Sequence, residues 1–358
     1  MRLHRPRVGT ERPLVSVVIP CYNYGHYLPE AVHSVLAQPG VELEVIVVDD
    51  CSTDDSATVA ERLAAQHPQV RLIRNPVNKR HIATYNTGLA EVTGDYVVLL
   101  SADDQLAPGA LGRAAAVFEA HPRVSLVYGQ VLTFADAPLP QPRHARSWST
   151  WRGSDWVGRS CRTTGNLITN PEAIVRREVI ERFGGYDARF PHTADMLLWL
   201  QAATVGDVGR VNGTQAYYRD HGANMHSTDY AGVLTDMRER SVLLEHFLGT
   251  EGPGSALPGA AGMRDASRRT FAREALRYAL NELDSPAPLE PEQVEALVAG
   301  LVEFAREQWP EATATTRVGR AVAARRRTGA PAWHSSASRR LFEARWALRW
   351  QRRHRWGT

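Results

Sequence analysis

The sequence predicts an α/β fold, in which a doubly wound, mostly parallel sheet is followed by a helical C-terminal extension. Three observations support this prediction. Short apolar runs alternate with helical patterns through the first 130 residues, carboxylate-rich turns follow several of these runs, and only helical patterns remain after Gly232. Alternation of strand and helix is typical of a parallel sheet that carries helices on both faces.

The first half of the chain accounts for the sheet. Apolar runs bounded by turn residues predict strands at 14–19, 43–48, 70–74, 96–100 and 125–128. Apolar residues that recur every three or four positions predict helices at 28–37, 54–66, 83–92 and 111–120. Because parallel strands need crossover connections, this order predicts a Rossmann-like arrangement, and the Pro-rich stretch 135–146 is expected to be a loop.

The second half of the chain has a different pattern. It predicts two short helices and one or two strands, at 177–183, 195–203 and 208–218. We therefore expect one domain over residues 13–230, in which 13–130 and 150–230 form two halves. A helical region is expected over 231–358.

Composition limits the classes of function. The three cysteines, Cys21, Cys51 and Cys161, match no zinc or disulfide spacing, so we expect a reducing, cytoplasmic location. Lys79 is the only lysine, which excludes Walker-type phosphate binding and Schiff-base chemistry elsewhere in the chain. No stretch has the apolar length of a membrane span, and the first residues lack the apolar segment of a signal peptide.

Polar side chains gather where the predicted strands end. The turns after the first, second and fourth strands are residues 20–23, 49–54 and 101–104. They include two pairs of adjacent carboxylates, Asp49 with Asp50 and Asp103 with Asp104. The carboxyl ends of parallel strands share one edge of a sheet, where ligands bind. Crowded carboxylates are unfavourable unless a cation relieves them, so a divalent metal is expected. The alternative role for Asp49 and Asp50 is helix capping, and the alternative for residues 101–104 is a plain turn.

Five sequence motifs follow one another along the chain. They are VSVVIPCYN (15–23), VIVVDDCSTD (45–54), NKRHIATYNTGL (78–89), GDYVVLLSADD (94–104) and ADMLLWL (194–200). In this order they resemble the inverting family 2 glycosyltransferases of the GT-A fold. The resemblance covers about residues 13–226 and does not include the helical remainder.

This resemblance implies a site for a nucleoside diphosphate-sugar, with uridine as the expected base. Pro20 and Tyr22 would form the wall on which the base rests, and Asp50 would accept a hydrogen bond from the base edge. Arg80 would approach the base or the phosphates, although a solvated surface arginine is the alternative. Ser101 would bond the ribose; the family usually has aspartate at this position, and serine brings no charge.

The resemblance also implies a metal site. Asp103 takes the place of the metal-binding aspartate of the family's Asp-X-Asp motif, and Asp104 would support it. The cation would be Mn²⁺ or Mg²⁺, bridging the protein to the diphosphate. His221 would touch the metal or the diphosphate from a loop that closes on the site, although a lone histidine also serves structural roles.

Asp195 aligns with the family's catalytic aspartate and would be the general base that takes the acceptor's proton. The alternative is a helix-capping aspartate packed behind Trp199. Ala194 is a further departure, because the family commonly has an acidic residue there. The two departures leave open a competing hypothesis, in which the chain is a non-catalytic nucleotide-sugar-binding or assembly partner. The acceptor also stays open between a glycan, a lipid-linked molecule, a small molecule and a peptide.

The C-terminal tail is basic and aromatic. Residues 338–358 hold seven arginines and one acid, and helical spacing joins Leu341, Phe342, Arg345, Trp346, Arg349 and Trp350. Such a helix could make peripheral contact with anionic lipid at the inner membrane face, or pack its tryptophans on the protein. No nucleic-acid-reading motif accompanies the charge, so no nucleic-acid partner is expected.

Overall fold

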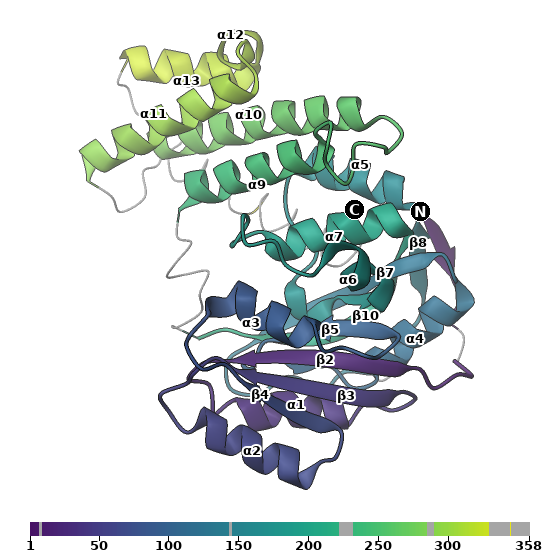
Figure 1. Ribbon diagram of the computed structural model, residues 1–358. Coiled ribbons are helices and arrows are strands. Elements are labelled where there is room, and N and C mark those ends of the chain that lie inside the picture. Colours follow the sequence, from purple (N-terminus) through teal and green to yellow (C-terminus); the bar gives the residue numbers. More distant parts are fainter. Residues whose placement is uncertain (7–8, 143–144, 222–231, 285–289, 329–343, 345–358) are drawn as a thin grey trace. The chain divides into compact units, whose positions relative to one another are not determined.

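The computed structural model describes residues 1–6, 9–142, 145–221, 232–284, 290–328 and 344. The chain divides into two compact units, one of residues 1–157 and 166–224 and the other of residues 158–165 and 225–358. Helix α5 (Gly153–Thr163) begins in the first unit and ends in the second. In Figure 1 the strands lie in the purple-to-teal part of the chain, and the green-to-yellow part is helical.

One mixed sheet of ten strands organises the first unit. Its order is β1-β8-β10-β7-β9-β5-β2-β3-β4, and the short β6 pairs with β10. Neighbouring strands run parallel from β5 through β2 and β3 to β4, and β7 and β10 are also parallel. The strands are β1 (Arg2–His4), β2 (Leu14–Cys21), β3 (Glu42–Asp49), β4 (Val70–Arg74), β5 (Tyr96–Leu99), β6 (Gln105–Leu106), β7 (Val124–Phe134), β8 (Trp148–Trp151), β9 (Ile174–Arg176) and β10 (Asp207–Arg219).

Helices connect these strands, as the alternating pattern predicts, and the α/β class is confirmed. Besides α5, the first unit contains α1 (Leu28–Leu36), α2 (Ser56–Gln66), α3 (Arg80–Leu89), α4 (Ala110–Ala120), the 3₁₀ turn η1 (Asn170–Glu172), α6 (Arg177–Phe183) and α7 (Ala194–Val205). Gly88 allows α3 to lie against the sheet, because a Cβ atom there would overlap Val18 and Val48. The last turn of α3 is thereby held close to β2 and β3.

The short elements at the centre and edge of the sheet were not predicted. Strand β9 has three residues and pairs antiparallel with both β5 and β7. Strands β1 and β8 pair with each other, and α5 follows β8 directly. Strands this short show no recognisable hydrophobic periodicity. They form only by pairing with segments that are distant in the sequence.

The second unit is helical in its described part, and its longest helix, α10 (Ala260–Asp284), packs against α9 (Val233–Leu248), α11 (Pro291–Gln308) and α13 (Arg317–Thr328). A short α12 (Ala312–Thr315) precedes α13. Buried side chains of these helices form its core, among them Phe247, Phe271 and Phe304. Among the described helices none has both the length and the apolarity to cross a membrane. The tail helix, for which lipid contact and packing on the protein are the two alternatives, lies outside the described residues, apart from residue 344.

Glu172, the last residue of η1, is a buried acid in the first unit. Its Oε1 accepts a hydrogen bond from the Thr169 amide at 2.9 Å, and its Oε2 has no hydrogen-bond partner. Desolvation raises the pKa of this carboxyl to about 8; the Thr169 amide, the charge of Arg210 and the Gly129 amide oppose the shift in part. The folded protein therefore favours the neutral acid.

Replacing Glu172 with glutamine is expected to remove a pH dependence of stability. A pKa raised from 4.5 to about 8 gives a contribution that is complete below pH 4.5 and is lost as the pH rises through 8. The loss amounts to about 5 kcal/mol, at roughly 1.4 kcal/mol per unit of pKa. Urea unfolding at pH 5, 7 and 9 measures how the free energy of unfolding changes with pH, and this change is the slope compared between variants. The exposed Glu178→Gln variant should keep the wild-type slope; a Glu172→Gln variant with that same slope would contradict the assignment.

Candidate functional site

Four strands end at one edge of the sheet and carry most of the predicted site residues. The three strands β2, β3 and β5 are mutually parallel, so their carboxyl ends meet there. Strand β9 runs antiparallel to β5 and to β7, and β10 is parallel to β7. Strand β10 consequently points the same way as β5. This topology brings His221, just after β10, to the turn at 101–104, although the two are over a hundred residues apart.

The turns after β2 and β3 are tied to each other. The Asn23 amide donates to Ser52 Oγ at 3.0 Å, and Asn23 Oδ1 accepts from the Thr53 amide at 2.8 Å. Asn23 has a φ of 58°, a left-handed conformation that asparagine tolerates better than most residues. Tyr22 remains 44% exposed beside the half-buried Pro20, so an aromatic face is presented to solvent at this edge. Sequence reasoning did not assign this cross-link to Asn23.

Asp50 anchors the loop that leads into α3. Its Oδ1 accepts hydrogen bonds from Asn75 Nδ2 at 2.8 Å and from the Lys79 amide at 2.9 Å, and its Oδ2 accepts one from the Arg80 amide at 2.9 Å. A carboxylate has about four lone-pair positions, so about one remains for a ligand. Arg80 has a φ of 66° and an exposed side chain. Asp50 and Arg80 are thus brought together through the backbone of Arg80.

Asp103, Asp104 and His221 meet at the end of β5. Asp103 Oδ2 lies 3.0 Å from His221 Nε2. Asp104 is buried, and its Oδ1 accepts a hydrogen bond from the Arg219 amide at 2.9 Å. The three residues, predicted separately from two distant motifs, form one cluster in the structure.

Arg219, which sequence reasoning did not single out, holds this cluster together. It is buried, and its Nε donates to the Asp103 carbonyl oxygen at 2.9 Å. Its guanidinium lies over the Tyr27 ring at 4.5 Å and over the Phe134 ring at 4.4 Å, and it pairs with Glu30. These contacts fix the end of β10 against the turn after β5. Its position two residues before His221 was the sole signal in the sequence.

The charge of Asp103 affects the pKa of two neighbouring groups. Desolvation and the charge of Asp103 hold the pKa of Asp104 well above its ordinary value, although the Arg219 amide and charge lower it in part. Desolvation, followed by the charge of Asp103, raises the pKa of Tyr24 to about 12. A cation or a positively charged ligand group would be stabilised here.

The donor atoms at this edge suit a divalent cation that shares its coordination with a substrate. Asp103 Oδ2 and His221 Nε2 are close enough to hold one ion between them. Mg²⁺ and Mn²⁺ favour carboxylate oxygen and commonly take their other ligands from phosphates and water. In the described part of the chain, no group of three or more His, Cys, Asp or Glu side chains is arranged for a metal. An ion held by these two side chains would need its other ligands from a bound molecule or from water.

Asp195 lies in the first turn of α7. Its Oδ1 accepts a hydrogen bond from the Met196 amide at 2.6 Å, and its Oδ2 accepts one from Asn166 Nδ2 at 2.8 Å. Desolvation of this half-buried carboxyl raises its pKa to about 6, against the lowering effects of Met196, Asn166 and the charge of His192. An oriented carboxylate with a pKa near 6 can accept a proton at neutral pH.

Ser101 is connected toward Asp195 through other side chains. Its Oγ lies 3.2 Å from the hydroxyl of Tyr85, whose ring packs edge-on against Tyr186. The charge of Asp195 is one cause of the raised pKa of Tyr186, after desolvation and Tyr85. Within the described residues, no direct hydrogen bond joins Asp195 to the Asp103 cluster. Sequence reasoning missed Tyr85, because its position inside a helix pattern carried no sign of this contact.

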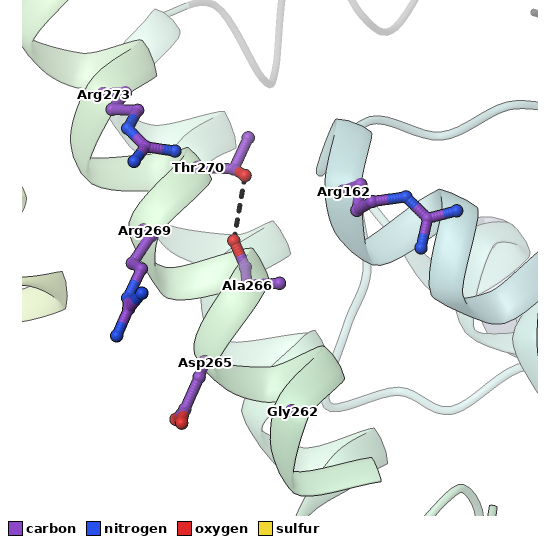
Figure 2. A pocket seen from close by; sticks show the side chains of 7 residues that line it. All are labelled: Arg162, Gly262, Asp265, Ala266, Arg269, Thr270 and Arg273. Carbon is purple, nitrogen blue, oxygen red and sulfur yellow. Dashed lines mark hydrogen bonds between the residues drawn. The ribbon is translucent and has the colours of Figure 1, made fainter. Parts of the chain in front are cut away.

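A cavity of about 620 Å³ in the second unit contains none of these residues. Its lining includes Arg162 of α5 together with Arg269 and Arg273 of α10, and Figure 2 shows the guanidinium of Arg162 directed away from α10. The three cations do not converge on one point. We therefore locate the candidate site at the sheet edge.

Comparison with known proteins agrees with this location. Residues 16–184 match the family model described as glycosyl transferase family 2. This segment contains the turns after β2, β3 and β5. An uncharacterized glycosyltransferase of Nostoc sp. is 32% identical over 217 residues, which is 59% of this chain and 66% of the relative. The chain thus spans just under two thirds of that relative's length.

Solved structures share the fold at low sequence identity. TarS of S. aureus (residues 1–349), crystallised with UDP-GlcNAc, aligns with a TM-score of 0.58 at 19% identity, over 88% of this chain and 92% of TarS. A mannosyltransferase from Pyrobaculum calidifontis, solved with GDP-Man and Mn²⁺, aligns with a TM-score of 0.50 over 90% of this chain and 89% of its own. At this identity the likeness establishes the architecture alone.

Proposed function

This chain belongs to glycosyl transferase family 2 and has the GT-A fold, and from that premise we propose that it transfers a single sugar from a nucleoside diphosphate-sugar to an acceptor hydroxyl with inversion. The observation that carries the proposal is the meeting of Asp103, Asp104 and His221 beside the turns after β2 and β3. A negative edge next to an exposed aromatic side chain suits a diphosphate with its cation and a flat base.

The donor would bind across the ends of β2, β3 and β5. Tyr22 and Pro20 would contact the base, and Asp50 would use its remaining lone pair for a polar group on the base edge. Arg80, exposed at the start of α3, would add positive charge near the phosphates. UDP is the expected carrier, since TarS was solved with UDP-GlcNAc, and a GDP-sugar is the alternative that the mannosyltransferase suggests.

Asp103 and His221 would hold Mn²⁺ or Mg²⁺, which when bound would neutralise the charge of the departing diphosphate. Asp104 would act on Asp103 through the shared backbone, because its own carboxylate is buried and engaged with Arg219. The pairing of Arg219 with Glu30 would keep this turn from moving when the ligand leaves.

Asp195 would carry the proton transfer. The acceptor oxygen attacks the anomeric carbon, its proton passes to an Asp195 carboxylate oxygen, and the bond between that carbon and the diphosphate oxygen breaks. The Met196 amide and Asn166 orient the carboxylate, one on each oxygen. Attack from the face opposite the diphosphate inverts the anomeric configuration.

A panel of nucleotides tests the proposal. We expect UDP or GDP, and the matching nucleotide-sugar, to raise the melting temperature by several degrees in the presence of Mn²⁺, since a ligand at a hundred times its Kd adds about 2.7 kcal/mol to stability. The nucleotide-sugar should also be hydrolysed slowly to the nucleoside diphosphate. A shift without hydrolysis would favour the non-catalytic binding partner, and the absence of both would contradict the proposal.

A further inference from the structure

Four side chains form a continuous relay of hydrogen bonds beneath the proposed donor site. Ser101 Oγ lies 3.2 Å from the Tyr85 hydroxyl, Asn170 Nδ2 donates to that hydroxyl at 3.0 Å, and the Tyr186 hydroxyl donates to Asn170 Oδ1 at 2.6 Å. Tyr85 and Tyr186 are buried. The relay joins the end of β5 to the segment that precedes α7.

The direction of each proton in the relay follows from its neighbours. The amide of Asn170 uses its NH₂ group on Tyr85 and its oxygen on Tyr186, so it offers Tyr85 no acceptor. The proton of Tyr85 then has one acceptor within the described residues, Ser101 Oγ. A buried hydroxyl that left its proton unpaired would be unfavourable, so Tyr85 donates and Ser101 accepts.

This polarity determines what Ser101 can offer a ligand. Ser101 is half-buried, and its hydroxyl carries one proton and two lone pairs. With one lone pair taken by Tyr85, the proton of Ser101 is available at the edge of the sheet, two residues before Asp103. A donor there suits an oxygen that only accepts, such as a phosphate oxygen.

We propose that Tyr85 is a positioning residue that orients Ser101 as a hydrogen-bond donor to an acceptor oxygen of the bound nucleoside diphosphate. The inference rests on the proposed function, because it assigns the Ser101 hydroxyl to that ligand. An aspartate, which the resemblance gives at this position, accepts hydrogen bonds and adds a charge. Ser101, oriented by Tyr85, instead donates a hydrogen bond to the ligand. Because serine carries no charge, it also leaves this edge less negative beside the diphosphate.

Substitutions at residue 101 test the polarity directly. Calorimetric titration with the nucleoside diphosphate that binds wild type, in the presence of Mn²⁺, should give a Kd about three- to tenfold higher for Ser101→Ala, the range expected for one lost hydrogen bond. Ser101→Thr keeps the hydroxyl and should bind like wild type. Ser101→Asp should bind at least as weakly as Ser101→Ala, and binding tighter than wild type would overturn the proposal.

Tyr85→Phe tests the positioning role. It should raise the Kd about as much as Ser101→Ala does, while the kcat for hydrolysis of the nucleotide-sugar stays within about twofold of wild type. The double variant should bind no more weakly than the weaker single variant, because both remove one interaction. Effects that multiply would contradict the relay. Tyr96→Phe removes the hydroxyl of another buried tyrosine, on β5, and should leave the Kd unchanged.

A measurement without ligand separates this inference from the proposed function. If no nucleotide binds wild type, the proposed function fails, and the relay is then judged by a double-mutant cycle on the free energy of unfolding. Tyr85→Phe and Ser101→Ala should be coupled in that cycle, since their hydroxyls bond each other. Independent effects on unfolding would overturn the relay whatever the ligand.

Discussion

Replacing Asp195 with asparagine is expected to lower the kcat for hydrolysis of the nucleotide-sugar about 10²- to 10⁴-fold, the range that general base catalysis contributes. Asparagine keeps an oxygen for the Met196 amide but cannot take a proton from water or an acceptor. The Kd for the nucleoside diphosphate should stay within about twofold, because Asp195 has no place in donor binding in this account. Steady-state kinetics of diphosphate release, beside calorimetric titration, measure both quantities.

The pH profile gives the same assignment a second readout. Desolvation raises the pKa of Asp195 to about 6, so the base is charged above that pH and protonated below it. The kcat of wild type should be half-maximal near pH 6 and fall about tenfold per unit at lower pH, and Asp195→Asn should lack this limb. Asp207→Asn, which alters a surface ion pair with Arg123, is the matched control and should behave as wild type. An asparagine variant of near-normal kcat would exclude Asp195 as the base.

Replacing Asp103 with asparagine is expected to abolish the Mn²⁺-dependent part of donor binding. The carboxylate is the charged half of the Asp103–His221 pair, and asparagine keeps the shape without the charge. A metal contribution of several kcal/mol corresponds to at least about a hundredfold loss of kcat/KM. The measurement is the shift in melting temperature with UDP or GDP, with and without Mn²⁺, which should be the same in both conditions for the variant.

Asp95→Asn is the control for this experiment. Asp95 precedes β5 at the opposite edge of the sheet, where its Oδ2 accepts a hydrogen bond from the Leu14 amide at 3.2 Å. The substitution makes the same chemical change near the same strand, away from the candidate site. Its Mn²⁺-dependent shift should equal that of wild type. A persistent Mn²⁺ effect in Asp103→Asn would place the cation elsewhere.

The central strands could be predicted because the local sequence of each is enough to indicate a buried strand. Residues 14–19 and 43–48 form apolar runs between polar turns, and both are buried parallel strands in the structure. Strand β9 differs, because its three residues are strand only through pairing with β5 and β7. Local sequence patterns do not contain that information.

The residues of the candidate site also fall into those that the local sequence predicts and those that it does not. Asp50 and Asp103 could be proposed from the sequence, because each lies in the turn after a recognisable strand. The partners that hold them, Asn75, Arg219 and His221, come from loops and a strand end that the fold brings together. Of these, His221 was proposed through a family resemblance, while Arg219 and Asn75 were not, since their residue types are common and their spacing has no period.

The central claim, that a nucleoside diphosphate and its cation bind at the carboxyl edge of β2, β3 and β5, is tested most directly by a crystal structure with UDP or GDP and Mn²⁺. We predict electron density for the base beside Tyr22 and Asp50, and for the ion between Asp103 and the diphosphate. Nucleotide density at any other place on the chain, with this edge filled by water, would contradict the claim.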